Sequence, residues 1–417
     1  MAARGAWIAL TVATSFFVFE FVARVEPSLA APEIAAFYHL SNAGFGTLAS
    51  LFFWIYAPMQ ILVGLLLDRF GARRFVILGS CCCALGVTAF AWTRTLDIGA
   101  AGRVLTGFGA SFAFVSALYL VNHWFAPERF AVLSGTVNAA GMVGTAIGAP
   151  LLGAAISSAG WRAIFFATGA AGFLIFLAAA SFLRTVKSPA TVATSTPVEH
   201  VRDSLSAVLS NGRVWVLAVV GLLCYMPINV YAVLWGGSEL MTDHGVSQAS
   251  ADVLVSLVFW GMAMGSIAGG WIADALDHRK GVLLVGTVLT GLAYCAVLYR
   301  PIGNEWALGT LLFLAGFFNG TQMLTFAMAK EGESNALVGT VVAFVNMLGI
   351  AGALIFQPLV GLIADATGGD FRIALTTIPA CLGAAVLILL FLPEYRHPDH
   401  RPGARIPAEA GAPQESA

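Results

Sequence analysis

Long apolar segments dominate this chain. Twelve runs of mostly apolar residues follow one another, and each has about the 20 residues that a helix needs to cross a bilayer. They cover residues 6–26, 44–67, 75–93, 98–122, 130–157, 161–183, 214–240, 250–273, 281–299, 304–329, 336–364 and 373–392. Only 10% of the 417 residues are charged, against about 25% in soluble proteins. The sequence therefore predicts an all-α membrane protein with twelve transmembrane helices.

Polar segments divide the chain. The first run contains Glu20 and Arg24 and lacks a small-residue cleavage site, so we interpret it as a membrane helix and not as a signal peptide. Residues 184–213 are rich in Ser, Thr, Pro and charge, which predicts a soluble linker with a short surface helix near 203–210. Residues 394–417 are rich in Pro and Gly and are predicted to be a disordered tail. The expected bundles are residues 1–183 and 214–393.

The basic residues predict the orientation. If the N-terminus is cytoplasmic, fifteen of the 21 lysines and arginines fall in cytoplasmic segments and two lie within spans. The four at the outer side are Arg94, Arg162, Arg300 and Arg372. Cytoplasmic loops carry an excess of Lys and Arg. Both termini, the linker and the tail are therefore predicted to be cytoplasmic, in a bacterial-type inner membrane.

The two halves of the chain repeat one another. Gly64, Asp68 and Arg73 recur 206 residues later as Gly270, Asp274 and Arg279. Asn138, Gly141, Gly144, Pro150 and Gly153 recur 208 residues later as Asn346, Gly349, Gly352, Pro358 and Gly361. The repeat predicts two pseudo-symmetric six-helix bundles inserted in the same orientation, which is a design of secondary transporters.

Two motifs point to a family. The residues Gly64-x-x-x-Asp68-Arg69-x-Gly71-x-Arg73 resemble the loop signature of the major facilitator superfamily, except that Ala72 stands where the family often has arginine. Arg103, Gly107 and Gly109 resemble the signature of its fourth helix. With twelve spans and the repeat, this resemblance covers nearly the whole chain and implies the major facilitator fold. Residues 56–74, 124–135 and 346–361 resemble a bacterial branch of unassigned substrate that is related to lysosomal dipeptide transporters. The fifth span lacks the adjacent Gly-Pro typical of drug/proton antiporters.

The resemblance implies a gate at the cytoplasmic ends of the spans. In the family fold, Asp68 lies near the positive N-terminus of the eleventh helix, and Asp274 lies near that of the fifth. Both contacts hold the inner ends of the halves together while the cavity opens outward. For the basic residues the alternative is that they only keep the loops inside. The predicted gating residues are Gly64, Asp68, Arg69, Gly71, Arg73, Arg74, Gly270, Asp274, Arg279 and Lys280.

Ionisable residues inside spans are the strongest candidates for substrate or proton binding, because burying them is costly. Glu20, Arg24 and Arg103 lie within spans, whereas Glu26 is expected at the rim. At a rise of about 1.5 Å per residue, Glu20 and Arg103 lie at similar depths. Glu20 can pair with Arg103, or with Arg24 four residues later. The three charges sum to +1, so we expect Arg103 to bind an anionic group, with Glu20 as its partner and proton carrier. The alternative is a structural ion pair.

Three acids and several uncharged side chains complete the candidates. Glu239, Asp252 and Glu305 lie at span ends and are expected to contact water. The polar and aromatic candidates for the cavity are Tyr56, Gln60, Tyr119, Asn122, Asn138, Tyr225, Asn229, Tyr231, Trp235, Trp260, Asn319, Gln322, Asn346 and Gln357. Aromatic residues at span ends are more often interfacial anchors than ligands.

No feature predicts catalysis or a cofactor. The sequence has no G-x-x-x-x-G-K-[ST] loop for nucleotide phosphates. The six cysteines lie in apolar runs and the histidines lack metal spacing, so no metal site is expected. The net charge of −1 does not suggest nucleic-acid binding.

We therefore expect a monomeric secondary transporter that moves a small organic anion, amino acid or short peptide by alternating access, coupled to protons. The alternatives are a drug or metabolite antiporter and a non-transporting receptor on the same scaffold.

Overall fold

The computed structural model describes residues 2–126, 130–183, 205–331 and 337–393, and no strand occurs among them. Twelve helical segments are long and apolar enough to cross a membrane, which confirms the predicted number of spans. In the N-terminal half the elements are α1 (Ala2–Val25), η1 (Glu26–Ala30), α2 (Ala31–Tyr38), α3 (Asn42–Phe70), α4 (Ala72–Trp92), α5 (Leu96–Ala110), α6 (Ala113–Trp124), α7 (Phe130–Ala159) and α8 (Trp161–Phe182).

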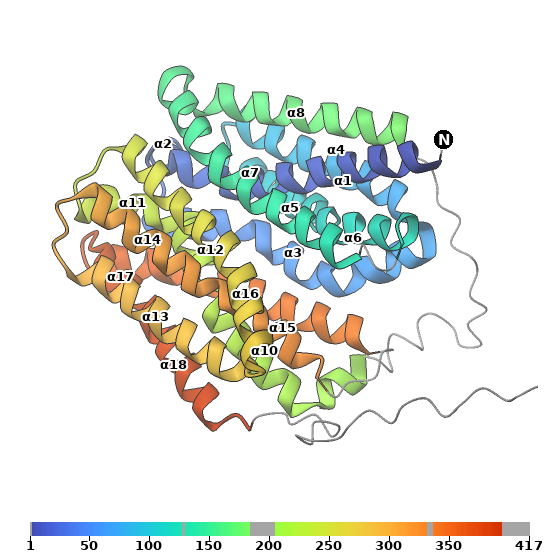
Figure 1. The fold of residues 1–417 in the computed structure, drawn as a ribbon. Coiled ribbons are helices and arrows are strands. Elements are labelled where there is room, and N and C mark those ends of the chain that lie inside the picture. Colours follow the sequence, from blue (N-terminus) through green and yellow to red (C-terminus); the bar gives the residue numbers. More distant parts are fainter. Residues whose placement is uncertain (1, 127–129, 184–204, 332–336, 394–417) are drawn as a thin grey trace, which may run out of the picture.

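The C-terminal half repeats this order. Its elements are α10 (Gly212–Cys224), η3 (Pro227–Trp235), α11 (Gly236–Asp243), α12 (Gln248–Leu276), α13 (Arg279–Tyr299), α14 (Glu305–Asn319), η4 (Gly320–Met323), α15 (Leu324–Ala329), α16 (Val338–Ala366), α17 (Phe371–Leu375) and α18 (Thr377–Phe391). Residues 205–210 are also helical, within the segment of the predicted surface helix. Figure 1 shows the two groups of helices, with α1–α8 above and α10–α18 below.

Among the described residues, five spans contain irregular turns. Four of these turns lie at related positions in the two halves, and the remaining one lies in the twelfth span, between α17 and α18. The first span passes through the 3₁₀ turn η1 and the seventh through the π-helix η3. The fourth span breaks between α5 and α6, and the tenth contains the 3₁₀ turn η4. Such interruptions of a helix often mark functional positions. They therefore direct attention to the first, fourth, seventh and tenth spans.

The first span is longer than the sequence suggests. It runs from Arg4 to Tyr38, whereas it is predicted to end at residue 26. The sequence Glu26-Pro27 looks like a helix end, because proline lacks an N–H and cannot continue the hydrogen bonding of an α-helix. Here Pro27 is the second residue of η1 and Pro32 the second residue of α2, and both positions tolerate proline. The span therefore continues past Glu26 and buries it.

The two halves meet at one end of the bundle. We call the end with the connections 39–41, 93–95, 160, 244–247, 300–304 and 367–370 the outer end, and the opposite end the inner end, following the predicted orientation. Backbones of the halves come close at the outer end, where a Cβ built on Gly46 of α3 would lie 2.5 Å from the carbonyl oxygen of Gln357 in α16. In Figure 1 the halves lie together near α2 and α11.

Candidate functional site

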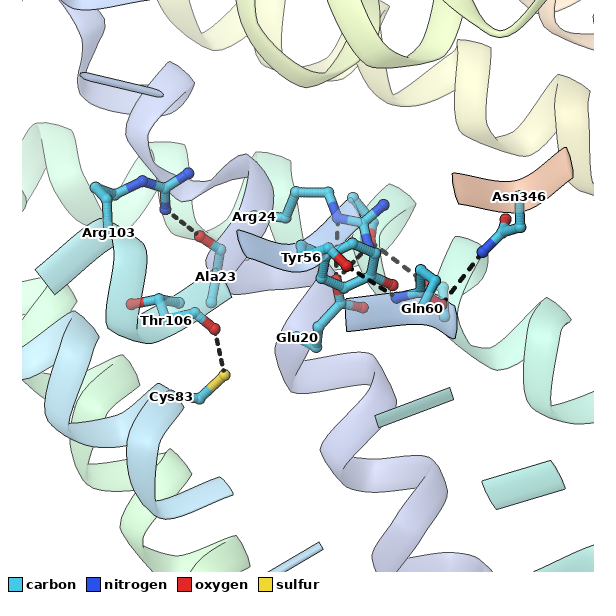
Figure 2. A network of polar contacts seen from close by, with 11 residues as sticks. Glu20, Ala23, Arg24, Tyr56, Gln60, Cys83, Arg103, Thr106 and Asn346 are labelled. Carbon is cyan, nitrogen blue, oxygen red and sulfur yellow. Dashed lines mark hydrogen bonds and ion pairs between the residues drawn. The ribbon is translucent and has the colours of Figure 1, made fainter. Parts of the chain in front are cut away.

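A buried ion pair lies near the middle of the molecule. Glu20 and Arg24 are one turn apart on α1 and are 0% and 4% exposed. The Arg24 Nε donates to Glu20 Oε1 at 3.0 Å, and a terminal guanidinium nitrogen donates to the same oxygen. Glu20 Oε2 is buried without a hydrogen-bond partner among the described residues. Figure 2 shows the pair beside Tyr56 and Gln60 of α3. Of the two predicted pairings of Glu20, the structure forms the one with Arg24.

Aromatic rings surround the Arg24 guanidinium. Its central carbon lies 4.5 Å from the ring centre of Phe21 and 5.0 Å from that of Tyr56. It also interacts electrostatically with Tyr225, which follows α10 in the other half of the chain. Rings of this kind stabilise a cation and exclude water. Arg24 is therefore held at the interface between the two halves.

Arg103 has a different environment, so its predicted pairing with Glu20 is wrong. Its guanidinium donates to the carbonyl oxygens of Ala23 at 3.0 Å and Ala49 at 3.3 Å. The Ala23 carbonyl would normally accept from the residue four positions later, but that residue is Pro27, which has no N–H. Arg103 supplies the missing donor (Figure 2). The Ala23 carbonyl is available to Arg103 only because Pro27 distorts the first span. The depth of Arg103 in the membrane does not reveal this partner.

A second acid is buried beside Arg103. Glu26 is 1% exposed, and the hydroxyl of Thr168 in α8 donates to its Oε1 at 2.7 Å. Glu26 and Arg103 attract one another electrostatically. The expectation that Glu26 lies at the rim is therefore wrong, because the span continues past it.

The burial of Glu26 changes the charge sum. In the described part of the N-terminal half, the buried charged residues are Glu20, Arg24, Glu26 and Arg103. Two carboxylates and two guanidiniums sum to zero when all are ionised, whereas the expected surplus of +1 counted only Glu20, Arg24 and Arg103.

One polar contact crosses between the halves near the ion pair. The Asn346 side-chain amide of α16 donates to Gln60 Oε1 of α3 at 3.3 Å. The Gln60 amide lies 3.5 Å from the Tyr56 carbonyl oxygen. Both Tyr56 and Gln60 are at most 5% exposed. These three predicted site residues therefore lie together with Arg24, as Figure 2 shows.

Three other predicted residues hold the backbone of the C-terminal half. Asn229 donates to the carbonyl of Gly349 at 3.1 Å, and Gln357 donates to the carbonyl of Asn229 at 2.7 Å. Asn319 donates to the carbonyl of Cys224 at 2.7 Å, where α10 ends. Irregular helices leave carbonyls without their usual partners. The amide side chains satisfy these groups and so fix η3 against α14 and α16.

The remaining predicted residues lie apart from the ion pair. The Tyr119 ring stacks on that of His123 in α6, with centroids 3.9 Å apart. Asn138 in α7 and Trp260 in α12 are half-buried, and Gln322 in η4 is buried.

The acids of the C-terminal half are more buried than expected. Glu239 is fully buried, accepts from the Tyr231 hydroxyl at 2.9 Å and lies 3.2 Å from His244. Its hydrogen bond to His244 raises the pKa of that imidazole above 6.5. Asp252 is 8% exposed. Helix packing at the outer end covers both acids, so the expectation that they contact water is wrong, whereas Glu305 is exposed as predicted.

The predicted gating motifs lie at the inner end. Gly71 joins α3 to α4 with φ of 77°, a conformation that favours glycine. Arg73 donates to the carbonyls of Leu183 at 2.6 Å and Ala180 at 3.1 Å, and Arg74 is exposed. The side chains of Asp68 and Arg69 lie outside the described part of the chain, so the role of Asp68 stays a prediction.

The second motif forms ion pairs within its own half. The guanidinium of Arg279 lies 3.6 Å from Asp274 Oδ1 and 2.9 Å from Glu331 Oε1. The Lys280 ammonium donates to the carbonyl of Leu392 at 2.6 Å. A Cβ built on Gly64 or Gly270 would meet no atom within 4 Å. The contact of Asp274 with the fifth span stays a prediction for the state in which the inner ends meet.

Metal ligands do not cluster in the described part of the chain, where no group of three His, Cys, Asp or Glu side chains could hold an ion. The fold and the site define a class of protein: two six-helix halves that enclose buried ionisable groups, as in secondary transporters.

The chain belongs to the Major Facilitator Superfamily, whose model matches residues 8–238 and 217–414. It is therefore a multi-pass integral membrane protein and a transporter, not an enzyme.

Similar proteins agree with this class. The chain is 28% identical over 380 residues to the hexuronate transporter of Bacillus subtilis, covering 86% of this chain and 88% of the relative. It is 24% identical over 431 residues to the probable galactarate/D-glucarate transporter of Escherichia coli K12, covering 93% and 92%. The crystal structure of a bacterial homolog of the human lysosomal transporter Spinster, inward-facing and unoccupied, superposes with a TM-score of 0.71 at 19% identity, covering 93% of this chain and 95% of that one.

Proposed function

We propose that this transporter moves a small organic anion, of the size of a sugar acid, together with a proton. The neutral group formed by Glu20, Arg24, Glu26 and Arg103 carries the proposal. An anion added to this buried group would leave a net charge of −1 in a medium of low dielectric constant, which costs several kcal/mol. A proton that enters with the anion restores neutrality. Charge balance therefore favours joint transport of the anion and a proton.

Glu20 and Arg24 are suited to exchange these two ions. The two hydrogen bonds that Arg24 donates to Glu20 end on one oxygen, and the other oxygen has no partner among the described residues. Protonation of Glu20 removes its negative charge and releases the guanidinium fork, which matches a carboxylate or phosphate. We assign proton binding to Glu20 and anion binding to Arg24. Tyr56, Gln60 and Asn346 lie close enough to contact the rest of the solute.

We assign anion binding to Arg24 and not to Arg103, for which the sequence predicted it. Arg103 already donates to two backbone carbonyls and is balanced by Glu26. Freeing it would leave the Ala23 carbonyl buried without a partner, which costs about 1–3 kcal/mol. Releasing Arg24 from a protonated Glu20 leaves a neutral carboxyl, which costs less to bury than a carboxylate. Glu26 and Arg103 are therefore proposed to be structural.

The class of substrate is supported by two observations. The two relatives are a hexuronate transporter and a probable galactarate/D-glucarate transporter, and these sugar acids carry carboxylates. A crevice of about 380 Å³ between α1 and α7 includes Thr11, Thr14, Ser15 and Thr136 in its lining. It extends along α1 from Trp7 to Val18, on the inner side of the ion pair. The hydroxyl-bearing residues that line this crevice suit a polyhydroxylated solute better than a peptide.

Orientation is part of the proposal. We place both termini in the cytoplasm of a bacterial-type inner membrane, on the basis of the positive charges, and one chain supplies both halves of the path. In a background without native cysteines, Ala190→Cys in the linker should resist an impermeant thiol reagent in intact cells. Asn304→Cys, an exposed residue at the outer end, should react. The reverse pattern would overturn the orientation.

Uptake by the purified protein in liposomes tests the function. The solutes are D-glucuronate, D-glucarate, D-gluconate and glucose 6-phosphate, with D-glucose and a dipeptide as comparisons. We expect concentrative uptake of at least one anion when the outside is acidic, and none of D-glucose. Exchange of a hydrophobic cation for protons would support a drug antiporter. Binding without uptake would support a receptor, and preferred uptake of the dipeptide would overturn the substrate class.

A further inference from the structure

An acid from one half caps a helix of the other half at the outer end. Asp365 lies in the last turn of α16, and its carboxylate accepts from the backbone N–H groups of Asn42 at 2.9 Å and Ala43 at 2.8 Å. It also accepts from the Asn42 side-chain amide at 2.9 Å. Asn42 and Ala43 are the first two residues of α3. These three hydrogen bonds join the second span to the eleventh.

This contact completes the N-terminus of α3. The first four N–H groups of a helix have no partner within the helix. Ser41, the N-cap, accepts from the third of them, Gly44, at 3.2 Å. The first two rely on Asp365 of the other half. The negative charge of Asp365 also lies at the positive end of the α3 dipole, where an anion is stabilising.

Close backbone packing supports the contact. A Cβ built on Gly361, one turn before Asp365, would lie 2.3 Å from the carbonyl oxygen of Asn42. Only glycine at position 361 allows the two helices to approach this closely. The carboxylate therefore reaches α3 because the outer ends of the helices are in contact, and it must leave α3 when they separate.

We propose that Asp365 is a gating residue of the transport cycle, which stabilises the state with the outer ends closed. α3 and α16 run antiparallel, and Asp68 lies at the other end of the pair, on α3. The resemblance to the family assigns the inner end to Asp68. Asp365 forms the reciprocal contact: an acid at the C-terminal end of α16 that caps the N-terminus of α3. This role does not depend on which solute is carried or on proton coupling.

Distances between spin labels at the outer end test this role. Labels at Leu96→Cys of α5 and Glu305→Cys of α14 report the separation of the halves, in a background without native cysteines. Asp365→Asn removes the charge and one of the two acceptor oxygens. We expect the ratio of outer-closed to outer-open molecules to fall roughly five- to tenfold, as for loss of a charged group at a helix N-terminus.

The matched control is Asp370→Asn. Asp370 accepts from the N–H of Ile373 at 3.1 Å and so caps α17 within its own half. Its substitution should leave the distance distribution unchanged. Asn42→Ala removes one of the three hydrogen bonds and should shift the distribution less, in the same direction as Asp365→Asn. Equal distributions for wild type, Asp365→Asn and Asp370→Asn would overturn the proposal. If Asp365→Asn does not fold, an unchanged distribution for Asn42→Ala overturns it instead.

Discussion

Substitution of Arg24 by lysine separates an anion-binding role from a purely structural one. Lysine keeps the positive charge beside Glu20 but offers a compact ammonium in place of a planar fork. In the structure, Arg24 directs two donors at one carboxylate oxygen, which is the geometry that the proposal transfers to the substrate. Loss of one charge-assisted hydrogen bond to a bound anion costs about 1.5–3 kcal/mol. The affinity for the transported anion should therefore fall roughly 10- to 100-fold.

The matched control is Arg103→Lys. A single ammonium cannot reach the Ala23 and Ala49 carbonyls in the way that the two terminal nitrogens of Arg103 do. A buried carbonyl left without its donor lowers the stability of the fold by about 1–3 kcal/mol, while anion affinity should stay within about twofold of wild type.

Isothermal titration calorimetry gives the affinity of both variants, and tryptophan fluorescence during heating gives their stability. Wild-type affinity in folded Arg24→Lys would refute the assignment. So would a matching loss of affinity in Arg103→Lys.

Two further substitutions test the outer end. Gly46→Ala would place a Cβ 2.5 Å from the carbonyl oxygen of Gln357 across the α3–α16 interface, so spin-label distances at the outer end should lengthen. Gly135→Ala, with no atom within 4 Å of its Cβ, should leave them unchanged. The hydrogen bond to Glu239 raises the pKa of His244 above 6.5, so this contact stabilises the fold fully below pH 6.5 and is lost as the pH rises through the folded-state pKa. The melting temperature of wild type should fall as the pH rises through that range, and that of His244→Gln should change less. Parallel plots of melting temperature against pH for the two proteins would contradict this.

Periodicity and composition predict the fold because the bilayer imposes its own constraints. Each span must satisfy its backbone hydrogen bonds internally and present apolar side chains to lipid. The twelve spans and the repeat are therefore visible in the sequence, and so is the one-turn spacing of Glu20 and Arg24. The end of the first span was not predictable in this way, because Glu26-Pro27 looks like a helix terminus and instead begins the buried turn η1.

The contacts that the sequence does not predict are tertiary ones. The partner of Arg103 could have been inferred, since a proline at position 27 frees the carbonyl of Ala23, but only if the helix is known to continue. The contact of Asp365 with α3 joins residues more than 300 positions apart and exists in one arrangement of the halves. A pattern along one span carries no information about such a contact.

Glu20→Gln tests the central claim most directly. The amide keeps the shape of a protonated Glu20 and cannot release a proton, so Arg24 should stay free to bind the anion. In liposomes, the variant should exchange internal for external anion at a rate near that of wild type. It should lose the accumulation that a pH gradient, acidic outside, drives in wild type. Accumulation at the wild-type level by folded Glu20→Gln would contradict the account, because the proton would then bind elsewhere.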